Sequence, residues 1–295
     1  MTPGIRSVDN SKIWLIVNAD DYGYFGSVTR GILDGAREGL ITAAGILANS
    51  PDLDAHLQQA AAVDSLDCGV HLNLSYGEPL SDPIRRELRP WGGRFPGKFR
   101  AAAAVLARRL TLAAVETEWR AQIQRCHDGG VRLWFLNSHE HVHMLPALFG
   151  VASRLAAEFA IPHIRLTRPE WDTTRGPPAA VRNLLLGALS LGTALRRQKR
   201  PDEPRFLGSG VSGRLTVGYL RVKLPRLETG RVYELMCHPG YFDPAEVRDP
   251  ALVAYHGWEE ELSALRSPTF HDLRRRYDVG LIGYRHLPDP RPSRS

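Results

Sequence analysis

The chain has 295 residues, a charged fraction of 24%, a net charge of +6 and a pI of about 9.4. This length suits one large α/β domain or two small ones. The basic excess is concentrated in residues 196–205 and 274–276, where no aromatic side chains alternate with the charges. Nucleic-acid binding is therefore not favoured.

Three cysteines, Cys68, Cys126 and Cys237, are widely spaced and odd in number. This usage indicates reduced thiols, and we expect a cytoplasmic protein. Residues 1–12 lack the apolar core of a signal peptide, and no apolar run reaches the roughly 18 residues of a membrane span.

Strands and helices are predicted to alternate along the chain. The predicted strands are residues 13–17, 42–49, 67–74, 131–136, 163–166, 232–237 and 279–284. The predicted helices are residues 26–38, 52–62, 101–127, 145–159, 179–195, 259–265 and 270–276. Seven strands alternating with helices are typical of a parallel α/β fold.

One domain is expected over residues 13–287, after an N-terminal extension of residues 1–12. Insertions are expected near residues 75–100 and 167–230, and residues 288–295 read as a disordered tail rich in Pro, Arg and Ser.

Polar side chains recur where the predicted strands end. They are Asp20 and Asp21 after the first strand, His71 in the third, His139 after the fourth, Arg165 in the fifth and His238 after the sixth. In a barrel of parallel strands, the carboxyl ends form the rim on which active sites are built. We therefore expect these side chains to share one site.

Three histidines, His139, His141 and His143, alternate directly after the fourth predicted strand. On an extended chain they share a face, and imidazole is a common metal ligand. Pro146 follows closely, so the chain must soon turn into a helix. His139 stays nearest the rigid strand and is the expected ligand. The alternative is a run of surface histidines.

A site of two histidines and one carboxylate leaves positions open for water on a catalytic metal. Paired carboxylates suit a division of labour in which one binds the cation and the other takes a proton. Taken separately, Asp20 and Asp21 also fit a helix N-cap, and His71 also fits a hydrogen-bonded core histidine.

Four motifs together resemble the YdjC-like carbohydrate deacetylases, which include chito-oligosaccharide deacetylases and hopanoid-associated deacetylases. They are Asn-Ala-Asp-Asp-Tyr-Gly at 18–23, Gly-Val-His-Leu-Asn-Leu at 69–74, Ser-His-Glu-His-Val-His at 138–143 and Cys-His-Pro-Gly at 237–240. The resemblance covers residues 13–286. It implies a deformed (β/α) TIM-like barrel, a divalent cation, Mg²⁺ or Zn²⁺, and removal of acetyl groups from N-acetylated sugars.

The resemblance also implies roles for individual residues. Asp21, His71 and His139 match the metal ligands. Asp20 matches the general base, and His238 is the expected acid near the leaving amine. We expect Arg165 to orient Asp20, with an ordinary salt bridge as the alternative. His141 and His143 are expected to contact the substrate or to support a ligand.

Asn137 is a departure from the family pattern, since many members have Asp at this position. An amide lacks the charge with which Asp would act on a ligand histidine. Asn at this position is found in the hopanoid-associated branch, which favours a lipid-linked sugar.

Two other functions remain open from the residues alone. Two histidines and a carboxylate also describe non-haem iron oxygenases. The other alternative is a catalytically inactive sugar-binding protein. The helix predicted at residues 179–195, followed by basic residues 196–200, suits packing on the barrel or on a second subunit of a homodimer. The alternative is contact with an anionic membrane surface.

Overall fold

The structure, a computed structural model, describes residues 9–97, 100–170, 187 and 203–289. Its centre is one sheet in which every strand pairing is parallel. The strands are β1 (Ile13–Tyr22), β2 (Ala43–Ile46), β3 (Asp67–Leu72), β4 (Leu133–Ser138), β5 (His163–Ile164), β6 (Arg205–Leu207), β7 (Val232–Cys237) and β8 (Val279–Leu281).

The strand order is β5-β4-β3-β2-β1-β7-β6, and β8 also pairs with β1. Strand β7 pairs with one edge of β1. The other edge of β1 pairs with β8 at the beginning of β1 and with β2 at the end of β1. Among the described residues no strand pairing joins β5 to β6, so the sheet curls without closing. This confirms the predicted α/β fold with a deformed barrel.

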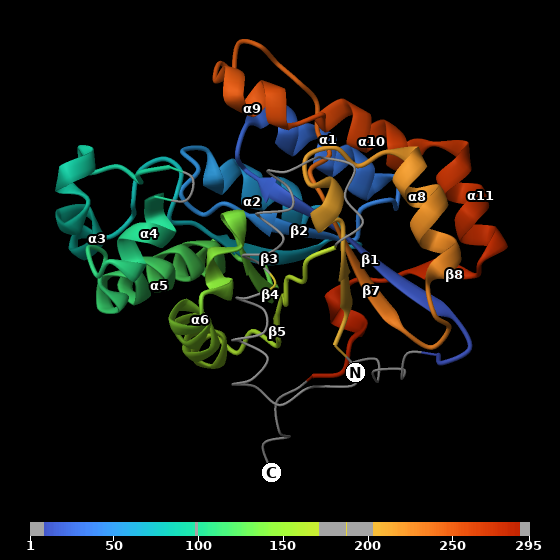
Figure 1. The fold of residues 1–295 in the computed structure, drawn as a ribbon, viewed down its shortest axis with the longest axis horizontal. Coiled ribbons are helices and arrows are strands. Elements are labelled where there is room, and N and C mark those ends of the chain that lie inside the picture. The colour runs from blue at the N-terminus through green and yellow to red at the C-terminus, as the bar shows by residue number, and fades with distance from the viewer. Residues whose placement is uncertain (1–8, 98–99, 171–186, 188–202, 290–295) are drawn as a thin grey trace.

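Helices cover the outside of the curled sheet (Figure 1). Those beside β3, β4 and β5 are α3 (Asp82–Glu87), α4 (Arg100–Leu106), α5 (Leu112–Asp128) and α6 (Pro146–Glu158). The others are α1 (Gly26–Arg37), α2 (Leu53–Ala61), α8 (Val217–Lys223), α9 (Pro250–Tyr255), α10 (Trp258–Arg266) and α11 (Pro268–Arg276). Short 3₁₀ segments are η1 (Arg89–Trp91), η2 (His139–Met144), η3 (Ser209–Val211), η4 (Leu224–Arg226) and η5 (Tyr284–His286).

The two faces of the strands have different neighbours. In β1, Leu15, Val17 and Ala19 join the main apolar core under the helices, whereas Ile16 belongs to a smaller core inside the curl, with Phe135 and Tyr284. Because side chains alternate along a strand, the inner face of β1 continues from Ile16 to Asn18 and Asp20. Apolar side chains thus fill the inside of the curled sheet near the beginning of β1, and polar side chains line it near the carboxyl ends of the strands.

The structure differs from the sequence prediction in several segments. The single helix predicted at residues 101–127 is wrong, because Arg108 turns left-handed with φ 57° and Thr111 caps the new helix α5 through its side chain. Strand β6 and helices α8 and α9 were not predicted. Strand β1 extends to Tyr22, so Asp20 and Asp21 lie within it and not after it, as had been predicted. Short helices α3 and η1 lie within the insertion expected near residues 75–100.

Most of the helix predicted at residues 179–195 lies outside the described residues, as do residues 1–8 and 290–295. Among the helices that are described, none combines the length and apolar composition of a membrane span.

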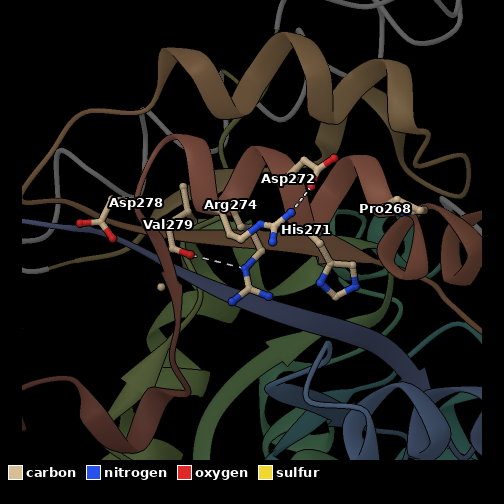
Figure 2. A pocket seen from close by; sticks show the side chains of 8 residues that line it. Pro268, His271, Asp272, Arg274, Asp278 and Val279 are labelled. Carbon is tan, nitrogen blue, oxygen red and sulfur yellow. Dashed lines mark hydrogen bonds and ion pairs between the residues drawn. The ribbon is translucent and has the colours of Figure 1, made fainter.

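A surface hollow of about 580 Å³ lies between α11 and β8 (Figure 2). Within it Arg275 forms an ion pair with Asp272, and Arg274 Nε donates to the Val279 carbonyl over 3.4 Å. Val279 pairs with Ile13 at the start of β1. The hollow is therefore at the end of the sheet opposite the strand-end polar residues.

Candidate metal and active site

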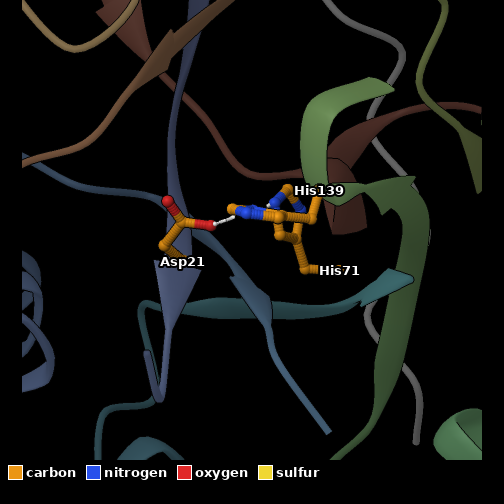
Figure 3. A group of neighbouring side chains, drawn as sticks. All are labelled: Asp21, His71 and His139. Atoms are coloured by element: carbon orange, nitrogen blue, oxygen red, sulfur yellow. Dashed lines mark hydrogen bonds and ion pairs between the residues drawn. The ribbon is translucent and has the colours of Figure 1, made fainter. Parts of the chain in front are cut away.

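Three side chains predicted as metal ligands converge at the carboxyl ends of the strands (Figure 3). Asp21 comes from β1, His71 from β3 and His139 from the turn after β4. Asp21 Oδ1 lies 3.2 Å from His71 Nε2 and 2.8 Å from His139 Nδ1. Their candidate ligand atoms all lie within 4.8 Å of one another. The side chains of Asp21 and His71 are buried, and that of His139 is 14% exposed.

The backbone at Asp21 brings two adjacent carboxylates to one site. Neighbours on a regular strand point to opposite faces, but Asp21 is left-handed with φ 67° and the pairing of β1 with β2 shifts register between Ala19 and Tyr22. Aspartate tolerates this conformation better than most residues, although it still costs on the order of 1 kcal/mol. Asp20 keeps its place on the inner face, and Asp21 turns toward His71.

Asn137 fixes the protonation of His71. Its Nδ2 donates to Asp20 Oδ1 over 2.9 Å, and its Oδ1 lies 2.7 Å from His71 Nδ1. Because a carboxylate only accepts, the amide nitrogen must face Asp20 and the amide oxygen must face His71. His71 Nδ1 therefore carries the proton.

The residues fit a divalent cation. With Nδ1 held by Asn137, the nitrogen of His71 that is left to bind a cation is Nε2, which lies 3.2 Å from Asp21 Oδ1. Two imidazole rings and one carboxylate make a donor set typical of a divalent metal site. A ligand histidine typically donates its other N–H to a neighbouring oxygen, as His71 does to Asn137.

Asp20 forms a buried ion pair with Arg165. The guanidinium donates from Nη1 to Oδ2 over 2.6 Å and from Nη2 to Oδ1 over 2.8 Å. Arg165 Nε donates to Glu234 Oε1 over 2.6 Å, and Asn18 Nδ2 donates to the same oxygen over 3.0 Å. The guanidinium is thus held on two edges, and it orients the Asp20 carboxylate.

Both aspartates are ionised at neutral pH. Burial raises the pKa of Asp20, but the charges of Arg165, His71 and His238 outweigh burial and lower that pKa to about 2. Burial also raises the pKa of Asp21, and the neighbouring His139 and His71 hold it well below its usual range. The site therefore carries the negative charge that a cation would balance.

Only the first histidine of the 139–143 run joins the cluster. Glu140 and His141 are left-handed, with φ 58° and 57°, so the chain does not stay extended. His141 is half-buried, its Nδ1 lies 3.2 Å from the Thr167 hydroxyl, and its ring contacts Phe206 edge-on.

His143 points away from the cluster. Its Nε2 donates to the Arg165 carbonyl over 3.0 Å, and the Ser138 hydroxyl donates to its Nδ1 over 2.5 Å. Burial lowers the pKa of His143 to about 3, so the ring is neutral. Its contacts tie the turn after β4 to the backbone of Arg165.

His238 follows β7, one residue beyond the pairing of Cys237 with Ala19, which puts it at the level of Asp20. Its backbone N–H donates to the buried Glu261 carboxylate. Its side chain is almost buried, and its Nδ1 has no hydrogen-bond partner among the described residues.

Two glycines let the loop that carries His238 approach α1. A Cβ at Gly31 would lie 2.6 Å from Gly240, and a Cβ at Gly240 would lie 2.9 Å from the Val28 Cα. Both distances are too short for a side chain. The Gly in the Cys-His-Pro-Gly motif is therefore required for close packing against α1.

Sequence reasoning missed two residues of the site. Glu234 is a charged residue inside an otherwise apolar strand, which was the available signal. Gly45 carried no such signal in the sequence. A Cβ at this position would lie 3.1 Å from Asn137 Oδ1 and 3.2 Å from His71 Nδ1, so a glycine leaves the space that the Asn137–His71 hydrogen bond needs.

Known proteins resemble this chain in sequence and in fold. Residues 14–276 match the family model of the YdjC-like protein. A carbohydrate deacetylase of Geobacillus stearothermophilus is 31% identical over 276 residues, covering 93% of this chain and 98% of the relative. A chitooligosaccharide deacetylase of Citrobacter koseri is 30% identical over 234 residues, covering 78% of this chain and 82% of the relative.

One solved structure shares the fold. It is the crystal structure of a proposed cellobiose-phosphate cleavage protein from Enterococcus faecalis, with a TM-score of 0.68 and 24% identity. The match covers 93% of this chain and 98% of that one. At this identity the likeness bears on the fold alone.

Proposed function

This chain belongs to the YdjC-like family, and on that premise we propose that it is a metal-dependent hydrolase that removes the acetyl group from an N-acetylated amino sugar. The observation that carries the proposal is the convergence of Asp21, His71 and His139 beside an Asp20 carboxylate held by Arg165. Relatives named carbohydrate deacetylase support the substrate class.

Asp21, His71 and His139 are the proposed ligands of a divalent cation. When bound, such a cation would polarise the amide carbonyl and lower the pKa of water in the site. Two imidazole nitrogens with one carboxylate oxygen favour Zn²⁺, whereas Mg²⁺ prefers oxygen ligands. We therefore rank Zn²⁺ above Mg²⁺.

Asp20 is the proposed general base. Its Oδ1 accepts from Arg165 and Asn137, while its Oδ2 accepts one hydrogen bond from Arg165. One lone pair of Oδ2 is left to take a proton from water. The hydroxide formed in this way adds to the acetyl carbon, and Arg165 keeps Asp20 in one orientation throughout.

His238 is the proposed acid. The carbon–nitrogen bond breaks as the nitrogen takes a proton, and the products are acetate and a free amino sugar. The unpaired Nδ1 of His238, close to Asp20 and almost buried, supports this role. We also infer a reducing, cytoplasmic location, which the three free buried cysteines support.

Acetate release from a panel of acetylated compounds tests the function. The panel contains N-acetylglucosamine, its β-1,4-linked oligomers, a lipid-linked N-acetylglucosamine and an acetylated peptide, each assayed with zinc or magnesium added. We expect release from at least one sugar. Asp20→Asn is expected to lose at least a hundredfold in kcat while keeping its metal, because it removes a base and not a ligand.

Three outcomes would overturn the proposal. Release from the peptide alone would exclude a carbohydrate deacetylase. Sugar binding without release by the metal-loaded protein would indicate a sugar-binding protein. Oxygen consumption that depends on iron would indicate an oxygenase.

A further inference from the structure

A third basic region of the chain lies in the insertion between β3 and β4. Residues 85–109 hold eight arginine and lysine residues and a single acidic residue, Glu87. Arg85 and Arg94 form ion pairs with Glu78. Five more arginines are exposed and belong to none of the ion pairs that the described residues form. They are Arg86, Arg89, Arg100, Arg108 and Arg109.

Two leucines are exposed in the same region. Leu106, the last residue of α4, is 70% exposed, and Leu112, the first residue of α5, is 41% exposed. Single exposed leucines are common on protein surfaces, but these two flank one turn that also exposes Arg108 and Arg109. Leu106 is the most exposed large apolar side chain among the described residues. The turn over residues 106–112 therefore presents apolar and cationic side chains together.

The fold holds this turn in one conformation. Arg108 is left-handed with φ 57°, and the backbone N–H groups of Arg109 and Leu110 both donate to the Ala104 carbonyl, over 2.8 Å and 3.2 Å. The side chain of Leu110 is buried in the main core. The outward position of Leu106 is thus set by an anchored turn and not by a frayed helix end.

Hydrogen bonds place the arginines of α3 beside the same turn. Glu87, the last residue of α3, accepts from the Thr111 hydroxyl over 2.7 Å and from the Thr111 backbone N–H over 2.8 Å. Arg86 and Arg89 flank Glu87 in the chain, so they lie close to the turn. Figure 1 shows α3 and α4 at the outer edge of the molecule, beyond α5. We call residues 85–97 and 100–112 the basic cap.

An anionic lipid bilayer matches the chemistry of the basic cap. Its headgroups attract arginine side chains, and the acyl boundary just below them accepts leucine side chains. Nucleic acid also supplies phosphates, but its backbone offers no apolar layer for Leu106 and Leu112. Among the described helices none could span a membrane, so the contact would be made at the surface of the bilayer.

We propose that the basic cap docks this protein on an anionic membrane surface. Leu106 and Leu112 enter the boundary between headgroups and acyl chains, and the exposed arginines contact the lipid phosphates. The contact is peripheral and reversible, because few apolar side chains are inserted. The docking does not depend on the reaction, so vesicle binding without acetate release would leave it standing and count only against the deacetylase function.

Sedimentation with vesicles tests the docking. The full chain is mixed with vesicles of phosphatidylcholine and phosphatidylglycerol, or of phosphatidylcholine alone, and the bound fraction is measured at low and high salt. We expect binding to the anionic vesicles at low salt, and weaker binding at high salt because exposed charges are screened. Failure of the parent protein to bind anionic vesicles at low salt would overturn the proposal.

A double arginine variant tests the site of docking. Arg108→Ser combined with Arg109→Ser should lower the partition coefficient about thirtyfold, since each basic residue near an anionic surface contributes about 1 kcal/mol. Arg275→Ser combined with Arg276→Ser is the control, because it removes the same charge from exposed positions on α11. It should change binding little. Equal losses in the two variants would show attraction to the overall charge and would also overturn the proposal.

Leu106→Ser tests the insertion into the bilayer. It should lower the partition coefficient about tenfold, because the leucine side chain loses its transfer from water to an apolar environment. Val222→Ser, which removes a 44% exposed side chain on α8, is the control and should bind as the parent does. A loss in the arginine variant without a loss in Leu106→Ser would indicate a polyanion such as nucleic acid as the partner and overturn the bilayer. Thermal unfolding should give the same Tm for all variants, because the replaced side chains are exposed.

Discussion

The amide oxygen of Asn137 accepts a hydrogen bond from His71 Nδ1 over 2.7 Å, and this contact decides which nitrogen of His71 faces Asp21. The same amide donates to Asp20 Oδ1 over 2.9 Å. Asn137 therefore links the proposed base to a proposed metal ligand. An aspartate at this position has no proton with which to make the second contact unless it is protonated.

Two substitutions of Asn137 separate these contacts. Asn137→Ala removes both, and we expect metal affinity to fall roughly 10- to 100-fold, the usual effect of losing a hydrogen bond to a ligand histidine. Asn137→Asp keeps an acceptor for His71, so metal affinity should be retained. Its carboxylate would repel Asp20, however, and the acid limb of the pH–rate profile should move to higher pH. Metal titration and pH profiles check both variants, and metal loss in Asn137→Asp alone would contradict this account.

The ligand assignment predicts the metal content of four variants. Asp21→Ala, His71→Ala and His139→Ala should each be purified nearly metal-free, because each removes a converging donor. His143→Ala is the matched control from the same histidine run, since both of its ring nitrogens are engaged by Ser138 and Arg165. It should keep one metal per chain. Plasma emission measures the content. A metal-free His143→Ala beside a fully loaded His139→Ala would show the ligand set to be wrong.

Gly45→Ala should disturb the site by displacing the side chains of Asn137 and His71. The added Cβ would lie 3.1 Å from Asn137 Oδ1 and 3.2 Å from His71 Nδ1, so this pair must shift by a few tenths of an ångström. We expect metal affinity to fall about tenfold and stability to fall by about 1 kcal/mol. Gly150→Ala, whose Cβ would meet only an arginine terminus at 3.8 Å, is the control and should leave affinity unchanged. Equal affinities in the two variants would refute the steric role of Gly45.

His143 should make stability depend on pH below neutrality. Its pKa is about 3 in the folded protein and about 6.5 when unfolded. Between these values the unfolded chain binds a proton that the folded chain does not, so the free energy of unfolding falls as pH drops, by up to about 1.4 kcal/mol per pH unit. Asp20, with its pKa lowered to about 2, contributes only in a separate window below about pH 4.

Urea unfolding of the metal-free protein between pH 4.5 and pH 7.5 measures this slope, with the pH range chosen to lie above the Asp20 window. His143→Gln removes the titrating group, so its stability should fall less steeply toward acid pH than that of the parent protein. Parallel curves for the two proteins would mean that His143 is not held neutral by the fold.

The sequence by itself determined the order of strands and helices and the end of the sheet where the polar residues gather. Apolar runs of strand length followed by Asp, His and Arg are local patterns, and parallel strands bring their carboxyl ends to one edge whatever their detailed packing. That was sufficient to group Asp20, Asp21, His71, His139, Arg165 and His238. The helix break at Arg108 and the short strand β6 were not predicted, because an Ala-rich run and a three-residue strand carry almost no periodic signal.

Only the tertiary structure decided how each polar residue is used. The left-handed turns at Asp21 and at Glu140–His141 reorient side chains that sequence spacing treats as equivalent, which is why His139 joins the cluster and His143 faces the Arg165 carbonyl. Glu234 matters because it lies across the curled sheet from Arg165. Gly45 matters because β2 and β4 lie on either side of β3, which puts Gly45 beside Asn137. Such contacts join residues far apart in the chain, and their geometry depends on strand register and curl, which no local pattern encodes.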